Sequence, residues 1–569
     1  MYQVAIFNSM PFHYEMFGYI IHYCQQKEHK LVIYTNFKQS LHWHSFYVKH
    51  FSDYFFEFKD VSQFEEEKYI YDLIVITTDD DLEVKKEWFQ DTRINRKLVC
   101  VDHSNMIRTP KIPYSQHLAV RPFPFNHRKW ALPCYPIVEN ATNRLEKWNY
   151  DNTIHVVVVG GQYNKYNVPL FNRLRSEQGS DILLSIVSRS VDREGFQDIK
   201  IPYKIYENMN TDELMHLVQR ANYVLTDCTS QQYHIKGLSM SASIPLAFSN
   251  LTPLLISQQG NKGYQFQSAI EFDLESTDDI VLENNCMDFE RVQIMVEERK
   301  GLMDMLQSYL DDFLENKIPL VKIPKKMFQT WKTKDLSDIV TVLSNSWKKK
   351  NPEYDYYLFD DSDCDEYIKL NFDPRVYKAY QKIIPGALKA DLWRYCVLYI
   401  QGGVYIDLDT FCLGSIDDLL DEDIEFMTPI DLNRTEGEGE HNLFNAFMAI
   451  EPCSEIMLNS ILRVLLHVER NILTMYSKLD FSGPGVLGRS TNLFLKQSET
   501  SSFVGKEGKI GDTILLLHFD PKTEFVSEKE TEKKLFLNKN GSPELKKLYK
   551  EECDRLQVVD YLYTTEFLA

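Results

Sequence analysis

The sequence has few positive charges for its length, no long apolar run and no regular cysteine pattern. Aspartate and glutamate outnumber lysine and arginine by 83 to 63, so the formal net charge is −20. Nucleic-acid binding needs lysine and arginine gathered on one face, and this balance argues against a nucleic-acid partner. A phosphate-bearing ligand would need a local cation, either basic side chains or a bound metal, to offset the general negative field.

Two further absences concern the compartment in which the chain works. No stretch approaches the roughly 18 uninterrupted apolar residues that suggest a membrane-spanning helix, and Met1–Ile6 has no basic segment leading into an apolar run. The ten cysteines are scattered without a CxxC pair, which favours reduced thiols over a disulfide framework or a zinc site. We therefore expect no membrane span and a cytoplasmic location.

The chain is long and apolar enough for several folded domains. It has 569 residues, 44% of them hydrophobic, and domains of roughly 100 to 200 residues predict about three. Through residues 1–145, and again through 146–310, short continuous apolar runs alternate with helix-like segments, which indicates parallel α/β sheets. We expect an α/β protein with two Rossmann-like lobes over those ranges and a third domain over residues 311–569.

One C-terminal segment combines a helix, a glycine pair and a short strand. Residues 387–400 contain no glycine or proline and repeat apolar residues at helical spacing, which predicts a helix. Gly402 and Gly403 follow directly and should end it. The run Val404–Leu408 then predicts a buried strand.

Asp407 and Asp409 stand two residues apart in and just after this run. Alternate side chains of a strand project from one face, so both carboxylates should point the same way. Neighbouring carboxylates repel each other, and a divalent cation such as Mn²⁺ or Mg²⁺ removes that cost. The cation would also stabilise the charge that develops on a diphosphate leaving group. The pattern predicts a metal site at these two aspartates.

The predicted helix adds a charged pair, Asp391 and Arg394, which share a face because they are three residues apart. Arginine can hold phosphate or sugar oxygens in a fork, and the carboxylate can accept sugar hydroxyls. A local ion pair that only stabilises the helix is the alternative. The DxD spacing recurs, for example at Asp421–Asp423, in stretches that read as solvated loops. It is the helix, the glycine pair and the strand together that set Asp407 and Asp409 apart.

With these elements in place, the segment resembles glycosyltransferase family 32, the sugar-binding-region family with a DXD motif. Yeast initiating mannosyltransferases belong to this family, and the clostridial glucosylating toxins are distantly similar to it. Four further stretches carry the resemblance: Ile323–Trp331, Trp347 with Asn351–Asp361, Asn442–Pro452, and Ser482–Gly485. Phe328 stands where the family commonly has histidine.

The resemblance implies a GT-A fold, a nucleotide-sugar donor (a UDP- or GDP-sugar), a glycan acceptor, a Mn²⁺ or Mg²⁺ cofactor, and retention at the anomeric carbon. It also implies roles for individual residues. Trp331 would flank the nucleotide base with Gln329 at the same pocket, although an ordinary core tryptophan is the alternative. Asp391 and Arg394 would contact donor sugar and phosphate, and Gly483 would line the donor site.

The implied metal ligands are more specific. Asp407 would meet the ribose and metal-bound water, and Asp409 would ligate the ion directly. His518 is the candidate for the late polar ligand of the family, although no tryptophan follows it to complete the family pattern.

For the N-terminal lobes, the stretch Ser241–Ile256 resembles the late helix and strand of the donor-binding lobe of GT-B glycosyltransferases. A second active transferase there would make the protein bifunctional. A carbohydrate-binding or scaffolding module without catalysis is the other interpretation, since residues 1–310 contain no recognisable catalytic pair.

A different enzyme class also matches part of the motif. Val404–Thr410 fits the hhhDxDxT pattern of haloacid-dehalogenase-type phosphatases, in which Asp407 would be the nucleophile. That alternative leaves Asp391, Arg394 and the upstream family stretches unexplained.

Overall fold

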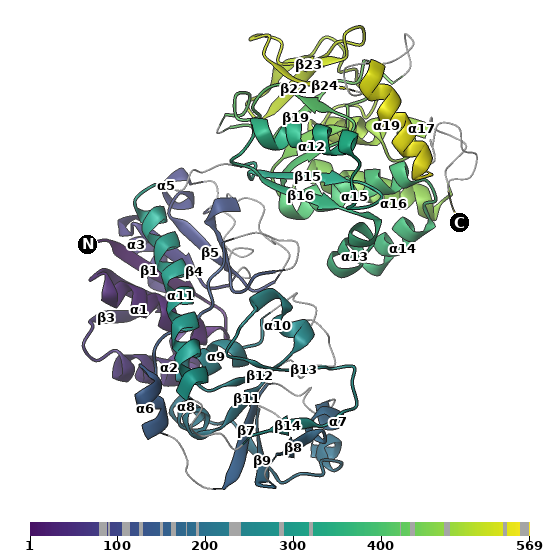
Figure 1. Ribbon diagram of the computed structural model, residues 1–569. Coiled ribbons are helices and arrows are strands. Elements are labelled where there is room, and N and C mark those ends of the chain that lie inside the picture. The colour runs from purple at the N-terminus through teal and green to yellow at the C-terminus, as the bar shows by residue number, and fades with distance from the viewer. Residues whose placement is uncertain are drawn as a thin grey trace. The chain divides into compact units, whose positions relative to one another are not determined.

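A computed structural model gives the fold of the chain (Figure 1). The residues that it describes are 1–78, 88, 91–104, 114–123, 129–147, 152–160, 167–177, 179–188, 193–226, 240–283, 289–317, 322–421, 423–432, 439–471, 478–538, 543–557 and 568. They form two compact units, the first built mainly from residues 1–105 and 115–319 and the second from residues 320–569.

The first unit begins with a parallel sheet of order β3-β2-β1-β4-β5-β6. Its strands are β1 (Gln3–Asn8), β2 (Lys30–Thr35), β3 (Phe56–Asp60), β4 (Leu73–Ile76), β5 (Leu98–Asp102) and β6 (His117–Ala119). The helices between them are α1 (Gly18–Gln26), α2 (Phe37–His50), α3 (Phe64–Glu67) and α5 (Thr92–Asn95). The central strands are continuous apolar runs, because helices cover a parallel sheet on both faces.

A second parallel sheet in the same unit has the order β10-β9-β7-β11-β12-β13, which repeats the strand order of the first. Its strands are β7 (Thr153–Val159), β9 (Asp181–Ser188), β10 (Tyr203–Glu207), β11 (Tyr223–Leu225), β12 (Leu254–Ser257) and β13 (Ile270–Phe272), with β8 (Leu174–Ser176) and β14 (Ile280–Leu282) paired beside it. Its helices are α6 (Ala141–Glu146), α7 (Val168–Phe171), α8 (Thr211–Arg220), α9 (Ser243–Asn250) and α10 (Gln258–Tyr264).

One long helix, α11 (Phe289–Leu314), runs beside both sheets of the first unit (Figure 1), and its side chains enter the core of each. Val292, Met295 and Leu302 pack in the core beside the second sheet. The last two turns, including Leu310 and Phe313, pack in the core of the first. The helix therefore ties the two parallel sheets into one unit, and it runs through the boundary that we predicted at residue 310.

The second unit has a mixed sheet of order β16-β15-β17-β20-β19-β22-β23-β24-β18. Its strands are β15 (Lys326–Thr330), β16 (Asp355–Phe359), β17 (Gly403–Ile406), β18 (Phe411–Cys412), β19 (Phe426–Pro429), β20 (Phe447–Ile450), β22 (Ile514–Phe519), β23 (Phe525–Ser527) and β24 (Lys534–Leu537), and β21 (Gly508–Ile510) pairs with β22. Strand β17 lies parallel to β15 and antiparallel to β20.

The helices of the second unit are α12 (Asp338–Lys350), α13 (Asp361–Asn371), α14 (Pro374–Lys382), α15 (Gly386–Gln401), α16 (Glu455–Glu469), α17 (Lys478–Phe481), α18 (Pro484–Phe494) and α19 (Pro543–Arg555). Helices α15, α16 and α18 pack in sequence against one another. Because α15 leads directly into β17, this packing fixes the start of the central strand.

The predicted α/β class with parallel sheets is confirmed, and short apolar runs of the kind predicted in residues 1–145 form strands β1, β2, β4 and β5. The division into three domains at residues 145 and 310 stays a prediction, as does the assignment of the units to the GT-B-like and GT-A classes.

Candidate functional site

Helix α15 carries Asp391 and Arg394 on a face that the protein covers. Most of its side chains from Leu388 to Gln401 are buried, and Asp391 and Arg394 are only 7% and 5% exposed. The helix begins after Pro385, where the missing N–H costs no helical hydrogen bond. The predicted helix over residues 387–400 is confirmed.

Gly402 and Gly403 make the turn from α15 into β17. Their φ angles are +58° and +92°, which favour glycine. A Cβ on Gly402 would lie 2.7 Å from Pro452, and one on Gly403 would lie 2.8 Å from the carbonyl oxygen of Lys326. The glycine pair is therefore required both for the turn and for close packing.

Strand β17 is shorter than we predicted, since it ends at Ile406 and residues 408 and 409 lie in a turn. The expectation that one regular strand carries both aspartates is therefore wrong. The Thr410 hydroxyl donates to the backbone carbonyl of Asp407 at 2.7 Å and holds this turn, and the Trp347 indole donates to Thr410 Oγ1. Leu408 is buried while Asp407 and Asp409 are each partly exposed, so both carboxylates still reach solvent.

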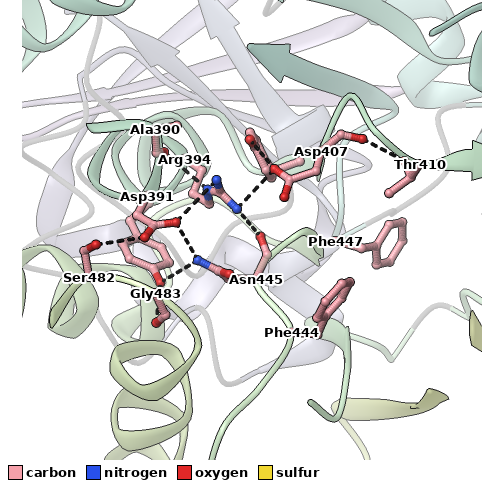
Figure 2. A network of polar contacts seen from close by, with 12 residues as sticks. Ala390, Asp391, Arg394, Asp407, Thr410, Phe444, Asn445, Phe447, Ser482 and Gly483 are labelled. Atoms are coloured by element: carbon pink, nitrogen blue, oxygen red, sulfur yellow. Dashed lines mark hydrogen bonds and ion pairs between the residues drawn. The ribbon is translucent and has the colours of Figure 1, made fainter. Parts of the chain in front are cut away.

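Asp391 is held by donors from two other segments (Figure 2). The Asn445 amide donates to its Oδ1 at 2.8 Å, and the Ser482 hydroxyl donates to its Oδ2 at 2.8 Å. A Cβ on Gly483 would come within 3.3 Å of the same carboxylate. The structure thus brings the predicted residues Asp391 and Gly483 together, with Asn445 between them.

Arg394 joins the two acidic positions of the site (Figure 2). Its guanidinium lies 3.3 Å from Asp391 Oδ1 and 3.3 Å from Asp407 Oδ1, and donates to the carbonyl oxygen of Asn445 at 2.8 Å. It also stacks on the Tyr405 ring, 4.3 Å from the ring centroid. The alternative of a merely local Asp391–Arg394 pair does not describe this arrangement, because Asp407 is a third member.

Burial sets the charges of this network. It raises the pKa of the Asp391 carboxyl above its usual value, although Arg394 and the Ser482 hydroxyl act in the opposite direction. Burial alone would lower the pKa of Arg394, but Asp407, Tyr405 and Asp391 together hold it above its usual value. The site therefore keeps a permanent cation between its carboxyl groups.

Asp407 and Asp409 have the donor chemistry that a hard divalent cation needs. The Tyr405 hydroxyl donates to Asp407 Oδ1 at 2.7 Å, and Arg394 contacts the same oxygen, so Oδ2 is the oxygen that can take a cation. The Asp407 side chain is 32% exposed. Mg²⁺ is commonly held by one or two carboxylates together with substrate phosphates and water, which fits two partly exposed aspartates at a turn.

Two predicted donor-site residues lie on and after strand β15. Gln329 is fully buried, its Oε1 accepts from the Tyr356 hydroxyl at 2.7 Å, and its Nε2 has no hydrogen-bond partner among the described residues. Trp331 is 9% exposed and packs in an apolar cluster that includes Leu408. Because Leu408 lies between the two aspartates in sequence, this cluster connects Trp331 to the DXD turn.

The structure does not bring His518 to the other predicted residues. His518 is on β22, which is separated from β17 by β20 and β19. Its Nδ1 lies 3.4 Å from Glu507 Oε1, and its side chain is 39% exposed. Its role as a metal ligand stays a prediction.

Comparison with known families assigns this segment. Residues 337–425 match the family described as a glycosyltransferase sugar-binding region containing a DXD motif. These residues are similar to the sugar-binding region of that family. The match covers α15, the glycine turn and both aspartates of the DXD motif, and it confirms the predicted resemblance to a DXD-type glycosyltransferase. The phosphatase alternative is not favoured.

Two curated relatives match this chain over about 100 residues each. The sugar-binding region is similar to the initiation-specific alpha-1,6-mannosyltransferase of Candida albicans, 38% identical over 101 residues, which is 17% of this chain and 26% of the relative. Inositol phosphoceramide mannosyltransferase 3 of Schizosaccharomyces pombe is 35% identical over 98 residues, 17% of this chain and 27% of the relative. The chain thus spans about a quarter of the length of these relatives.

Among solved structures, Anabaena HepE in complex with UDP and glucose matches with a TM-score of 0.36 and 10% identity, over 56% of this chain and all of that one. A likeness at this level assigns neither a ligand nor a mechanism. No helix among the described residues is long and apolar enough to cross a membrane.

Sequence reasoning missed three residues that complete the network around the sugar-binding region: Tyr405, Asn445 and Ser482. Asn445 and Ser482 lie within stretches that carry the family resemblance. The spacing of these stretches does not indicate that both residues donate hydrogen bonds to Asp391. Those hydrogen bonds depend on how α15 packs against distant loops.

Proposed function

We propose that this chain is a metal-dependent glycosyltransferase that moves a sugar from a nucleotide-sugar donor to a glycan or glycoconjugate acceptor. The observation that carries the proposal is the Asp391–Arg394–Asp407 network at the end of β17, inside the segment that matches the DXD sugar-binding region. The relatives named above are mannosyltransferases, so mannose is the sugar that we propose first.

Each residue has a role in this proposal. Asp407 and Asp409 would hold Mn²⁺ or Mg²⁺ against the donor diphosphate, and a bound cation there supplies Lewis-acid stabilisation of the leaving group. Arg394 fixes the Asp407 carboxylate through the 3.3 Å contact and adds positive charge beside the phosphates. Asp391, anchored by Asn445 and Ser482, would accept hydroxyl hydrogens of the donor sugar.

Gln329 and Trp331 complete the donor site. Gln329 would sit at the nucleotide pocket, where its buried Nε2 has no hydrogen-bond partner among the described residues. Trp331 shares an apolar cluster with Leu408 and would place the base next to the DXD turn. The GT-A class for the second unit and retention at the anomeric carbon belong to the same proposal, and the parallel β16-β15-β17 part of its sheet supports the former.

The test is nucleotide release from a panel of UDP-, GDP- and dTDP-sugars with Mn²⁺. We compare the full chain with Asp409→Asn and with Asp423→Asn, an exposed aspartate in another DxD spacing. Metal-dependent release from one donor should be lost in Asp409→Asn and kept in Asp423→Asn. Nucleotide release that survives Asp409→Asn would place the activity outside this site. The absence of release by the full chain with every donor would contradict the proposal.

A further inference from the structure

The first unit contains a cavity of about 540 Å³ between its two parallel sheets. From the second sheet it is lined by Val159 and Gly160 at the carboxyl end of β7 and by Val187 and Ser188 at the carboxyl end of β9. In open parallel sheets the carboxyl ends of the strands, where the strand order reverses, are the usual place for ligands. The order β10-β9-β7-β11 reverses between β7 and β11, and the cavity lies beside this position at the ends of β7 and β9.

The first sheet supplies the opposite wall. Trp43 comes from α2, and Glu15 comes from the short helical turn Tyr14–Met16 that precedes α1. Tyr135 and Ile137, from the segment between the two sheets, complete this wall. The volume lies within the range of roughly 300–1,000 Å³ that is common for small-molecule sites. None of these residues belongs to the DXD site, which lies in the second unit.

The side chains that line the cavity do not suit a phosphate ligand. Apolar and aromatic side chains dominate it, and no lysine or arginine occurs among the described residues that line it. The acidic side chain of the lining is Glu15, whose carboxylate lies 3.3 Å from His13 Nδ1, and His42 is the histidine of the lining. Burial would raise the pKa of Glu15, but the hydrogen bond and charge of His13 bring it below the usual value, so the carboxylate is ionised at neutral pH. An anionic diphosphate would meet this carboxylate without a lysine or arginine among the described lining residues to bind it.

The same groups suit an uncharged sugar. Aromatic rings such as Trp43 and Tyr135 present apolar faces against which the C–H face of a sugar ring can pack. An ionised carboxylate accepts hydrogen bonds from hydroxyl groups without needing a counter-charge on the ligand. Ser188 and Asn208 place further polar groups along the edge of the cavity.

We propose that this cavity is a second ligand site that binds an uncharged carbohydrate, the glycan acceptor, with Glu15 as a hydroxyl acceptor and Trp43 as a stacking surface. The identification of this carbohydrate as the glycan acceptor rests on the transferase function proposed above. The binding of a carbohydrate in the cavity does not depend on that function. Under this proposal the N-terminal part of the chain has a binding role, and the acceptors are neutral glycans.

The experiment measures binding of neutral manno- and gluco-oligosaccharides to the full chain by calorimetry, with UDP- and GDP-sugars as the comparison ligands. Leu214→Trp on α8 fills the cavity, and Leu217→Trp on the same helix but outside the lining is its matched control. Glu15→Gln removes the carboxylate charge, with the exposed Glu57→Gln as control. Asp409→Asn separates this site from the DXD site.

We expect a neutral oligosaccharide to bind the full chain and Asp409→Asn equally, to bind Glu15→Gln at least about tenfold more weakly, and not to bind Leu214→Trp. Leu217→Trp and Glu57→Gln should bind like the unaltered chain. Oligosaccharide binding that is unaffected by Leu214→Trp, or no oligosaccharide binding at all, would overturn the proposal. Nucleotide-sugar binding that is lost in Leu214→Trp but kept in Asp409→Asn would also overturn it, and would indicate a second donor site. Nucleotide release by Leu214→Trp tests the DXD function separately.

Discussion

At the scale of single residues, the site depends on one buried arginine shared by two carboxyl groups. The spacing of Asp391 and Arg394 is common on helix surfaces, so the sequence could suggest the pair but could not show its burial. The third partner, Asp407, lies just after β17. The hydrogen-bond donors Asn445 and Ser482 lie in distant loops. The sequence therefore indicated Asp391, Arg394 and Asp407, whereas their contacts and the supporting residues Asn445 and Ser482 required the packed structure.

We predict that Arg394→Lys abolishes most activity although it keeps the charge. Lysine cannot form the fork that spans Asp391, Asp407 and the Asn445 carbonyl, nor stack on Tyr405 in the same way. The free energy of unfolding should fall by about 1.5–3 kcal/mol, measured by urea denaturation beside kcat/KM. Arg375→Lys alters an exposed arginine that contacts Glu469 and should leave the free energy of unfolding nearly unchanged. Equal effects of the two variants would contradict this assignment.

We also predict that Asn445→Ala lowers kcat/KM for nucleotide release by about 10- to 100-fold, the usual effect of removing a group that orients a site residue. The loss frees Asp391 Oδ1 from its 2.8 Å hydrogen bond, so the carboxylate can turn away from the donor sugar. Steady-state kinetics with the preferred donor would check it. Wild-type kinetics in a folded Asn445→Ala variant would show that Asp391 needs no such support.

At the scale of elements, the glycine pair between α15 and β17 carried the most information in the sequence. It predicted where the helix ends and the strand begins, because glycine readily adopts the positive φ that the turn requires. The length of β17 was not predictable, since its last residues depend on the Thr410 and Trp347 hydrogen bonds that pull the chain into a turn.

We predict that Gly402→Ala destabilises the second unit by about 1–3 kcal/mol, because its Cβ would meet Pro452 and Pro324 and its φ is positive. Gly386→Ala, in open space at the start of α15, is the matched control and should be neutral or more stable by up to about 1 kcal/mol. Thermal and urea unfolding would measure both. A Gly402→Ala variant as stable as Gly386→Ala would show that the turn tolerates a side chain.

A second element-scale prediction concerns the antiparallel pair β19 and β20. Glu451 follows β20 and its backbone N–H bonds to Glu425, which precedes β19. Burial and the neighbouring Glu425 raise the pKa of Glu451 to about 8, although Lys322 acts against them. The folded state therefore holds a proton that the unfolded chain releases near its ordinary value, and the free energy of unfolding falls as pH rises through this interval.

Glu451→Gln should remove that part of the pH dependence. Its Tm should match that of the unaltered chain under mildly acidic conditions and exceed it by about 2–4 °C at alkaline pH, which corresponds to about 1 kcal/mol. The exposed Glu532→Gln should show no such divergence. A Tm difference that does not grow with pH would mean that Glu451 is already ionised in the folded protein.

At the scale of the whole molecule, composition and apolar rhythm predicted an α/β protein, and that much is confirmed. They could not predict that one helix serves two sheets, because the apolar residues of α11 repeat at one spacing whichever core they enter. The described core clusters nevertheless separate by unit: the cores of the two parallel sheets lie in the first and the core around Val404 and Phe447 lies in the second.

Separate cores predict separate unfolding. Differential scanning calorimetry of the full chain should show two transitions, and Gly402→Ala should lower only one of them. Arg299→Met should lower only the other, because Arg299 on α11 donates to the carbonyl oxygens of Val138, Glu139 and Phe248 in the first unit. One transition that shifts with both variants would show that the units unfold together.

Helix α11 also limits how the first unit can respond to a ligand. Its N-terminal half is packed into one core and its C-terminal half into the other, so a wide hinge opening between the sheets would have to bend the helix or pull it out of a core. Sliding over short distances is the cheaper movement for packed helices. Entry and exit at the cavity are then governed by side-chain rotation around its mouth, and the residence time of a ligand there should depend on the bulk of that rim more than on any domain motion.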